Sequence, residues 1–190
     1  MKILIINPNS SHEMTKLIDR VAKSVASPGT EIETIDFPQA PALINNSYDV
    51  MKCAYYSIEA ALAKQKEYDG LITACHSDPG LLMMKEVLEK PCTGIGFISE
   101  HMARLYGDRI TILTLSEATE LRKRPQLRSY FMEESLYSYM PTGFTEEMNE
   151  EEAKACLLKA GQKALEAYHS DVLILGCGGM SGLSDYLEAE

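Results

Sequence analysis

Short apolar runs rich in β-branched residues alternate along this chain with longer segments of helical period. The run from Lys2 to Ile6 is followed by a helical segment from Ser11 to Val25, and the pattern recurs without a low-complexity linker. This alternation is typical of βαβ units, which cover a mainly parallel sheet with helices, so we predict an α/β fold. Further strands are expected at Glu31–Ile35, Gly70–Ala74, Cys92–Ile98, Arg109–Leu115, Ser135–Tyr139 and Val172–Gly176, and further helices at Tyr48–Lys66, Pro79–Leu88, Glu100–Leu105, after Glu117 and at Glu150–Tyr168.

The second half of the chain repeats part of the first. Asp69 to Leu81 (DGLITACHSDPGL) aligns without gaps on Asp171 to Leu183 (DVLILGCGGMSGL), with six identities that include Cys75/Cys177 and Gly80/Gly182. Such internal similarity is the sequence signature of a repeated structural unit. We therefore predict two pseudo-symmetric α/β lobes, residues 1–97 and 98–190, each a mainly parallel sheet flanked by helices.

Four polar strand ends are candidates for a binding site. They lie near Asn7, Cys75, Thr114 and Cys177. Ligands of open α/β sheets bind beyond the carboxyl ends of the strands. If the lobes face each other, these strand ends meet at an active site between the lobes, with one thiol on each side.

Composition limits the partners and the location. A formal net charge of -10 without a long Lys/Arg block argues against nucleic acid or an anionic membrane as the main partner, so a small molecule is expected. Only four consecutive apolar residues precede Asn7, too few for a signal peptide or a membrane span, and a cytoplasmic location is expected. Five cysteines without a CxxC pair suit neither a zinc ribbon nor a closed disulfide framework, so reduced thiols and no metal site are predicted.

Two facing thiols can invert a stereocentre without a cofactor. A helix N-terminus lowers the pKa of a cysteine thiol, and Cys75 and Cys177 each precede an expected helix. A thiolate on one side removes a C–H proton while the opposite thiol delivers another. The backbone N–H groups of His76, Ser77, Gly178 and Gly179 could stabilise the resulting charge on an adjacent carbonyl or carboxylate, as an oxyanion hole does.

Other motifs receive structural explanations. Asp78 is expected to be an N-cap, with Pro79 at the first helical position. His101 and His169 are expected to be surface or packing residues. The glycines of Gly94 to Gly96 lack the spacing of a dinucleotide fingerprint, and the basic segment Arg122 to Arg128 is expected to be solvated.

The motifs together resemble the hydantoin racemase branch of the aspartate/glutamate/hydantoin racemase superfamily. They are INPNSS (Ile6 to Ser11), ACHSDPGL (Ala74 to Leu81), GIG (Gly94 to Gly96) and LGCGGM (Leu175 to Met180), and the similarity spans nearly the whole chain. The resemblance implies two pseudo-symmetric lobes, no metal or organic cofactor, and proton transfer by Cys75 and Cys177. It also implies that substrate contacts come from Asn7, Ile44, His76, Ser77, Thr114, Gly178 and Gly179, with Ile44 in a pocket loop over Ala42 to Tyr48.

Two departures from the family pattern stand out. His76 and Ser77 replace the aromatic and the small or acidic residue that are frequent there, which leaves a five-substituted hydantoin, an allantoin-like ureide and an amino acid as candidate substrates. After Cys75 the first lobe continues to Gly107, whereas the sequence ends at Glu190 soon after Cys177. We therefore expect the second lobe to lack its last strand and helix, as a shortened member or a truncated product, and we expect a homo-oligomer whose partner subunit covers the gap.

Three functions fit these residues. The first is a cofactor-independent racemase acting on a small carbon acid with a carbonyl or carboxylate next to the stereocentre. The second is a decarboxylase or cis/trans isomerase of the same superfamily, and decarboxylation needs only one thiol. The third is a noncatalytic relative that binds a small molecule. A thiol redox sensor is a weaker alternative, because the sequence does not place Cys75 and Cys177 within bonding distance.

Overall fold

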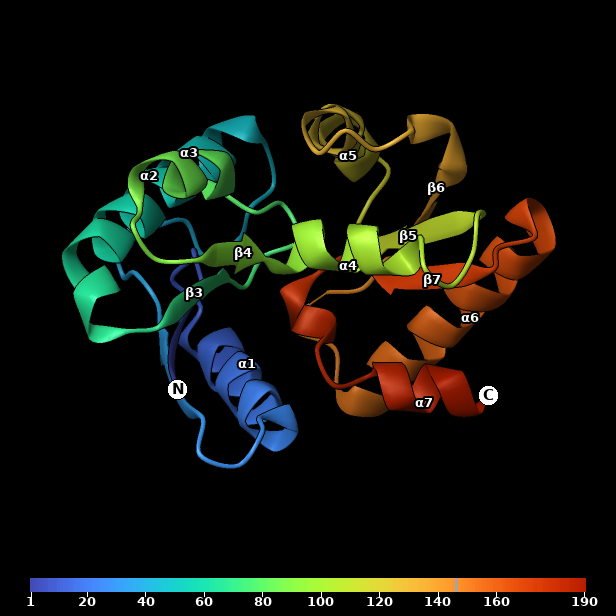
Figure 1. The fold of residues 1–190 in the computed structure, drawn as a ribbon. Helices are drawn as coiled ribbons and strands as arrows, with labels where there is room; N and C mark the ends of the chain where they lie inside the picture. The colour runs from blue at the N-terminus through green and yellow to red at the C-terminus, as the bar shows by residue number, and fades with distance from the viewer. Residues whose placement is uncertain (146) are drawn as a thin grey trace. The chain divides into compact units, whose positions relative to one another are not determined.

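The computed structural model describes residues 1–145 and 147–190. The chain divides into two compact units, Met1–Phe97 and Ile98–Glu190, each built on a parallel sheet flanked by helices (Figure 1). The predicted α/β fold is confirmed. The strands are β1 (Lys2–Ile6), β2 (Glu31–Ile35), β3 (Gly70–Thr73), β4 (Cys92–Gly94), β5 (Ile110–Thr114), β6 (Tyr137–Pro141) and β7 (Val172–Leu175), and the helices are α1 (His12–Val25), α2 (Ser47–Lys64), α3 (Leu81–Val87), α4 (Ile95–Ala103), α5 (Ala118–Ser129), α6 (Glu150–Tyr168) and α7 (Ser184–Ala189).

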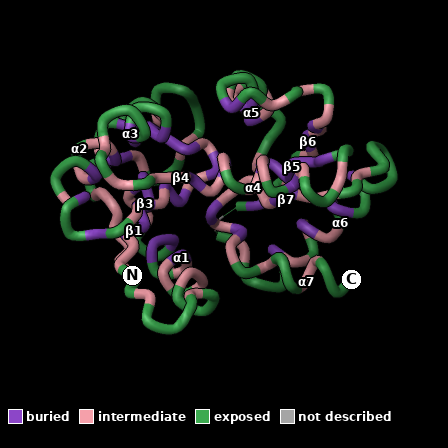
Figure 2. Tube along the Cα trace, in the orientation of Figure 1, coloured by how far each residue is buried: buried purple, intermediate pink, exposed green. Residues whose placement is uncertain are grey.

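The first unit has a four-stranded parallel sheet in the order β2-β1-β3-β4. Side chains alternate between the two faces of a strand. Ile5 therefore packs with Met14 and Ile18 of α1, while Leu4 packs on the opposite face with Ala61 of α2 and Met84 of α3. Figure 2 shows buried residues along the strands of this sheet and along the inward faces of its helices. The N-terminus of α1 is capped by Ser11, whose hydroxyl accepts the Met14 N–H at 3.4 Å.

The second unit has a three-stranded parallel sheet in the order β6-β5-β7. One face packs Ile110, Ile112 and Ile174 against Leu127 of α5 and Ala103 of α4. The opposite face packs Leu113 against Ala160 and Ala164 of α6, which form the apolar stripe of that helix. The strand order of this unit repeats the β2-β1-β3 order of the first.

The repeat extends to individual hydrogen bonds before β3 and β7, the strands that precede Cys75 and Cys177. The Asp69 carboxylate accepts the backbone N–H of Lys2 at 2.8 Å, and the Asp171 carboxylate accepts that of Arg109 at 3.0 Å. Each aspartate thus joins the loop before its strand to the central strand of its own sheet. Arg109 also hydrogen-bonds the Asp171 side chain, and these contacts lower the pKa of that carboxyl well below its usual range.

Asp78 is not an N-cap of the helix that follows it, which corrects the prediction. Helix α3 begins at Leu81 after Gly80, which has φ 80 and is the N-cap residue. The Asp78 carboxylate instead accepts the N–H groups of Gly96 at 3.0 Å and Phe97 at 2.6 Å, at the start of α4. This cap explains why the expected strand from Cys92 to Ile98 stops at Gly94 and a helix begins at Ile95.

Gly94 gives the Asp78 carboxylate its space. A Cβ at this position would lie 2.0 Å from Asp78 Oδ1. Gly94→Ala is therefore expected to displace the carboxylate from α4 and to lower the free energy of unfolding by about 2 kcal/mol, measured by urea denaturation. Gly70→Ala is the matched control, since its Cβ would meet only the Pro91 carbonyl oxygen, at 3.5 Å. Equal losses in the two variants would contradict this role of Asp78.

The basic segment from Arg122 to Arg128 is not wholly solvated, which corrects a second prediction. It lies in α5, where Thr119, Lys123 and Leu127 form the buried face of the helix. Lys123 Nζ lies 3.8 Å from Glu100 Oε1, and the two side chains are 1% and 0% exposed. Lys123 therefore lies on the buried face of α5, and its ammonium group pairs with the buried Glu100 carboxylate of α4 in the core of the second unit.

Candidate active site

Cys75 lies just beyond the carboxyl end of β3. The residue before it, Ala74, donates its N–H to the carbonyl of Ile6 in β1 at 2.8 Å, which fixes the strand end. The chain then turns, and Asp78 N–H bonds the Cys75 carbonyl at 2.8 Å. Cys75 is partly exposed. The local fold therefore places a reduced, partly accessible thiol at the strand edge that was predicted to bind ligand.

Asn7 lies beside this strand end, because Ile6 of β1 pairs with Thr73 of β3. Its amide nitrogen donates to Asn9 Oδ1 at 2.9 Å, to Ser11 O at 3.2 Å and to Thr15 Oγ1 at 2.9 Å. These bonds fix the orientation of the amide. Asn7 is 0% exposed, and its Oδ1 has no hydrogen-bond partner among the described residues. A buried acceptor without a donor is costly unless a ligand supplies one.

Cys177 occupies the equivalent place in the second unit. Gly176 donates its N–H to the Leu113 carbonyl of β5 at 2.9 Å, and Met180 N–H bonds the Cys177 carbonyl at 3.1 Å. Gly182 has φ 84, as Gly80 has φ 80 in the first unit. The Cys177 sulfur also accepts the Gly179 N–H at 3.4 Å. A donor directed at the sulfur stabilises its negatively charged form more than its neutral form.

Thr114 ends β5 beside this segment and is 1% exposed. Its hydroxyl donates to the Ser116 carbonyl at 3.2 Å, and its carbonyl accepts the Thr142 N–H at 2.8 Å. Thr114 therefore shapes the loop after β5 in this structure. Gly176 approaches the same strand closely, because an added Cβ would lie 2.6 Å from the Leu113 carbonyl oxygen.

The other predicted site residues have varied exposure. His76 is 3% exposed and Gly178 is buried, whereas Ser77, Gly179 and Ile44 are partly exposed. Ile44 precedes Asn46, which caps α2 by accepting the Asp49 N–H at 3.0 Å. The structure thus brings Asn7, Cys75, His76 and Ser77 to one strand edge of the first unit. It brings Thr114, Cys177, Gly178 and Gly179 to the corresponding edge of the second.

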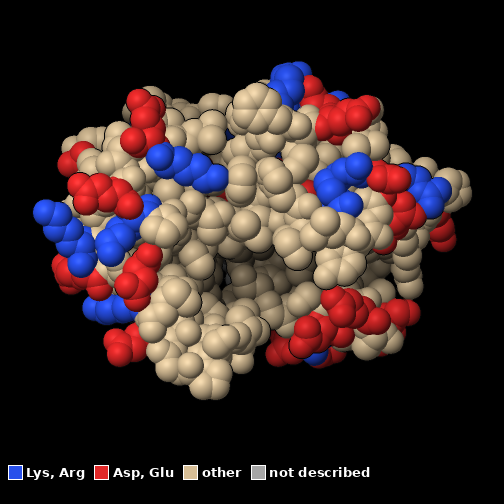
Figure 3. Space-filling model, viewed as in Figure 1, with Lys and Arg blue, Asp and Glu red and all other residues tan. Residues whose placement is uncertain are grey.

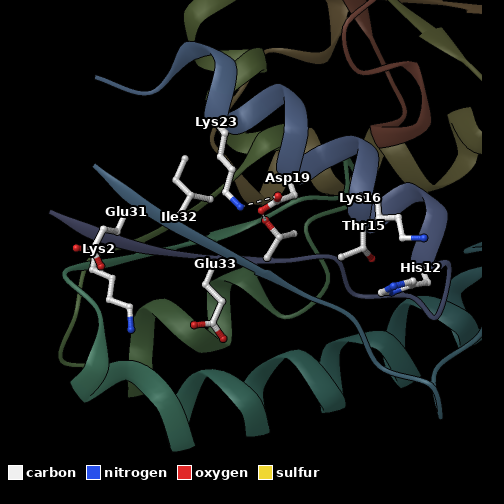
Figure 4. Close-up of a pocket in the computed structure, with 10 residues that line it drawn as sticks. Lys2, His12, Thr15, Lys16, Asp19, Lys23, Glu31, Ile32 and Glu33 are labelled. Atoms are coloured by element: carbon white, nitrogen blue, oxygen red, sulfur yellow. Dashed lines mark hydrogen bonds and ion pairs between the residues drawn. The ribbon is translucent and has the colours of Figure 1, made fainter. Parts of the chain in front are cut away.

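A surface groove of about 490 Å³ lies elsewhere on the first unit, between α1 and β2 (Figure 4). It is lined mainly by charged and polar residues, and it contains none of the predicted site residues. Lys23 Nζ pairs with Asp19 at 2.7 Å, Asp19 also accepts the Thr34 hydroxyl at 3.0 Å, and Lys16 pairs with Glu13 at 2.8 Å. The groove therefore lies apart from the predicted site residues of the first unit.

Charged side chains of both signs occur on the surface of the protein (Figure 3). On the face shown in Figure 3, Lys and Arg side chains are interspersed with Asp and Glu. Within residues 1–145 and 147–190, no group of three or more His, Cys, Asp or Glu side chains is placed to hold a metal ion. In the same ranges, no helix is both long enough and apolar enough to cross a membrane.

Comparison with known proteins identifies the family. The family model described as Asp/Glu/Hydantoin racemase matches residues 3–190. The chain belongs to this family. It is 32% identical to a hydantoin racemase of Pseudomonas sp. (strain NS671), an alignment that covers 100% of this chain and 78% of that protein. The predicted resemblance is therefore confirmed.

Two solved structures share the fold. The allantoin racemase from Klebsiella pneumoniae has a TM-score of 0.91 at 29% identity, covering 100% of this chain and 79% of that one. The allantoin racemase from Pseudomonas fluorescens has a TM-score of 0.92 at 24% identity, covering 100% of this chain and 82% of that one. The two α/β units of this chain thus have the fold of these two proteins.

Proposed function

We propose that this protein is a racemase of a small carbon acid in which Cys75 and Cys177 transfer protons at opposite faces of one stereocentre. The observation that carries the proposal is the repeated setting of the two thiols. Each cysteine follows a parallel strand, its carbonyl accepts the N–H three residues later, and a glycine with positive φ lies five residues later. A single such cysteine is explained by packing, whereas two equivalent ones suit a reaction that needs one base and one acid.

The proposed reaction uses one base and one acid on a single substrate. A thiolate at Cys75 removes the proton on carbon, and the Cys177 thiol gives its proton to the opposite face. The roles exchange for the other enantiomer. The pair of electrons released from the C–H bond is held on the adjacent carbonyl oxygen, which the backbone N–H groups of His76, Ser77 and Gly178 stabilise. These residues alone complete the proton transfers.

The substrate class we propose is a hydantoin or an allantoin-like ureide. Relatives named for hydantoin and allantoin racemisation support it. So does Asn7, whose buried Oδ1 is suited to accept an N–H from a ring amide or ureide. An amino acid remains the alternative substrate, since its ammonium group would satisfy the same acceptor.

The experiment is a panel of single enantiomers of hydantoins, allantoin and amino acids, followed by circular dichroism. We expect loss of the signal for at least one ureide or hydantoin, at a rate that exceeds the reaction without enzyme and is proportional to enzyme concentration. Release of carbon dioxide without racemisation of the substrate would indicate a decarboxylase instead. Binding without conversion across the panel would contradict an enzymatic function.

Asn7 gives a separate prediction about recognition. Methylation of the substrate nitrogen next to the stereocentre removes the donor for Asn7 Oδ1, so kcat/KM should fall about tenfold or more. In Asn7→Ala, which lacks the buried acceptor, the difference between the two substrates should largely disappear. Steady-state kinetics of both enzymes with both substrates measure this. An unchanged ratio in Asn7→Ala would show that Asn7 does not contact that nitrogen.

A further inference from the structure

The repeat between the two units extends upstream of the strand-end cysteines, to the preceding helices. Helix α2 begins at the cap Asn46 and α6 at the cap Asn149; each cap oxygen accepts an N–H three residues later at 3.0 Å. At the same distance in sequence from these caps, α2 carries Cys53 and α6 carries Cys156. The buried positions that follow also coincide: Ala54, Ser57 and Ala61 in α2 match Leu157, Ala160 and Ala164 in α6. Each unit therefore carries a second cysteine at an equivalent helical position.

In the first unit, α2 packs closely against the turn that follows Cys75. A Cβ on Gly80 would lie 3.0 Å from Ile58 Cγ1 and 3.3 Å from the carbonyl oxygen of Ala54, the residue next to Cys53. Cys53 itself is 0% exposed. Burial, followed by negative charge on Cys75 and on Asp49, raises the pKa of its thiol to about 12. The part of α2 that carries Cys53 therefore lies against the turn that follows Cys75.

In the second unit, Cys156 and Cys177 pack on one apolar cluster. Its buried members include Ala153, Leu157 and Met180, and both cysteines border it. The Cys156 thiol donates to the Ala153 carbonyl at 3.3 Å, and burial raises its pKa. The second unit thus repeats the pairing of a helix thiol with a strand-end thiol.

We propose that the helix cysteine of each unit is a resolving thiol, which forms a Cys53–Cys75 or a Cys156–Cys177 disulfide after a peroxide has oxidised the strand-end cysteine. In the first step the Cys75 thiolate attacks hydrogen peroxide, the O–O bond breaks, and sulfenic acid and hydroxide form. In the second step the Cys53 thiolate attacks the Cys75 sulfur. The S–O bond breaks, hydroxide leaves and the S–S bond forms. Cys156 and Cys177 react in the same way.

In the first unit the order of the steps follows from exposure. Cys75 is partly exposed, whereas Cys53 is fully buried, so peroxide reaches Cys75 first. Disulfide formation requires the Cys53 thiolate, whose fraction rises with pH as long as the pH is below its pKa of about 12. The second step should therefore accelerate about tenfold per pH unit between neutral and mildly alkaline pH. The disulfide is reversible by thiol reductants, whereas further oxidation of Cys75 to sulfinic acid is not.

The test treats the whole protein with hydrogen peroxide and follows it by intact mass and by mapping of non-reduced peptides. We expect a loss of two hydrogens for each pair and cross-linked peptides joining Cys53 to Cys75 and Cys156 to Cys177. In Cys53→Ala we expect the Cys75 peptide to gain two oxygens instead, and in Cys156→Ala the same at Cys177. Cys92→Ala is the matched control and should form both disulfides, because Cys92 pairs with Leu71 at the opposite end of β3.

The proposal for the first unit would be overturned if Cys75 gained oxygen equally in the parent and in Cys53→Ala and no cross-linked peptides formed. The proposal for the second unit would be overturned by the same result at Cys177 in the parent and in Cys156→Ala. The mass measurement does not depend on catalysis. Any effect on activity rests on the proposed function: activity should be lost with disulfide formation and recovered with dithiothreitol in the parent, but not recovered in Cys53→Ala. If the disulfides formed in a protein without racemase activity, the proposed racemase function would be refuted and the proposed oxidation of the cysteine pairs would be supported.

Discussion

Cys75→Ser and Cys177→Ser are each expected to lower kcat/KM for racemisation about a thousandfold, within the range that general acids and bases contribute. A serine hydroxyl keeps the size of the side chain, but it does not ionise near neutral pH and so cannot remove a carbon-bound proton. Both thiols are needed in every turnover, one as base and one as acid. The loss should therefore be similar for either substitution and in either direction of the reaction.

The measurement is initial-rate circular dichroism with each enantiomer of the best substrate from the panel. Cys92→Ser is the control, since burial raises the pKa of Cys92 and it lies away from the strand end that carries Cys75. It should retain most of the parent activity. A serine variant that keeps proton exchange with one enantiomer only would assign the face served by the remaining cysteine. Near-parental racemisation in either serine variant would exclude the proposed role of that cysteine.

Lys123→Met is expected to lower the free energy of unfolding by about 3 to 5 kcal/mol, the largest stability effect that we predict. The substitution removes one partner of a buried ion pair and leaves the Glu100 carboxylate in the core, where both side chains are almost fully excluded from solvent. It also removes the hydrogen bond from Lys123 Nζ to Gln126 Oε1 at 2.9 Å. The methionine fills a similar volume, so lost packing adds little.

Urea denaturation of three variants tests this prediction. Arg128→Met, on the same helix, removes an exposed ion pair with Glu134 and should cost less than about 1 kcal/mol. The double variant Lys123→Met/Glu100→Gln should be more stable than Lys123→Met, because no unpaired charge remains. If Lys123→Met and Arg128→Met were equally stable, the buried pair would not contribute as the structure indicates.

The fold was predictable from sequence because strand and helix periods are local properties. The alternation of strand and helix patterns predicted the parallel α/β fold. The two aligned segments that contain Cys75 and Cys177 predicted that the second half of the chain repeats the first. The boundary at β4 was missed because Cys92 to Ile98 has the composition of one strand. Its end at Gly94 depends on the Asp78 carboxylate, which caps α4 from a distant part of the sequence. Such a contact between separate parts of the sequence cannot be predicted from the composition of either part.

The candidate site was predictable only in part. The strand ends at Asn7 and Cys75 follow from the parallel sheet, and the structure shows them on neighbouring strands. The burial of Lys123 was missed because charge alone predicts exposure. The equivalence of Cys53 and Cys156 could have been found in the sequence, because each lies seven residues after an asparagine, Asn46 or Asn149, that caps its helix. An alignment without gaps conceals it, because Cys53 lies 22 residues before Cys75, whereas Cys156 lies 21 residues before Cys177.

The most direct test of two-base racemisation is the reaction of a single enantiomer in deuterated water, stopped after the first few per cent of conversion. Because one thiol removes the proton and the other, equilibrated with solvent, delivers a new one, the product enantiomer should carry deuterium on the inverted carbon from the first turnovers. The recovered starting enantiomer should retain its hydrogen. Mass spectrometry after chiral separation measures both. An inverted product that carries the original hydrogen in place of deuterium would contradict proton transfer by Cys75 and Cys177 from opposite faces.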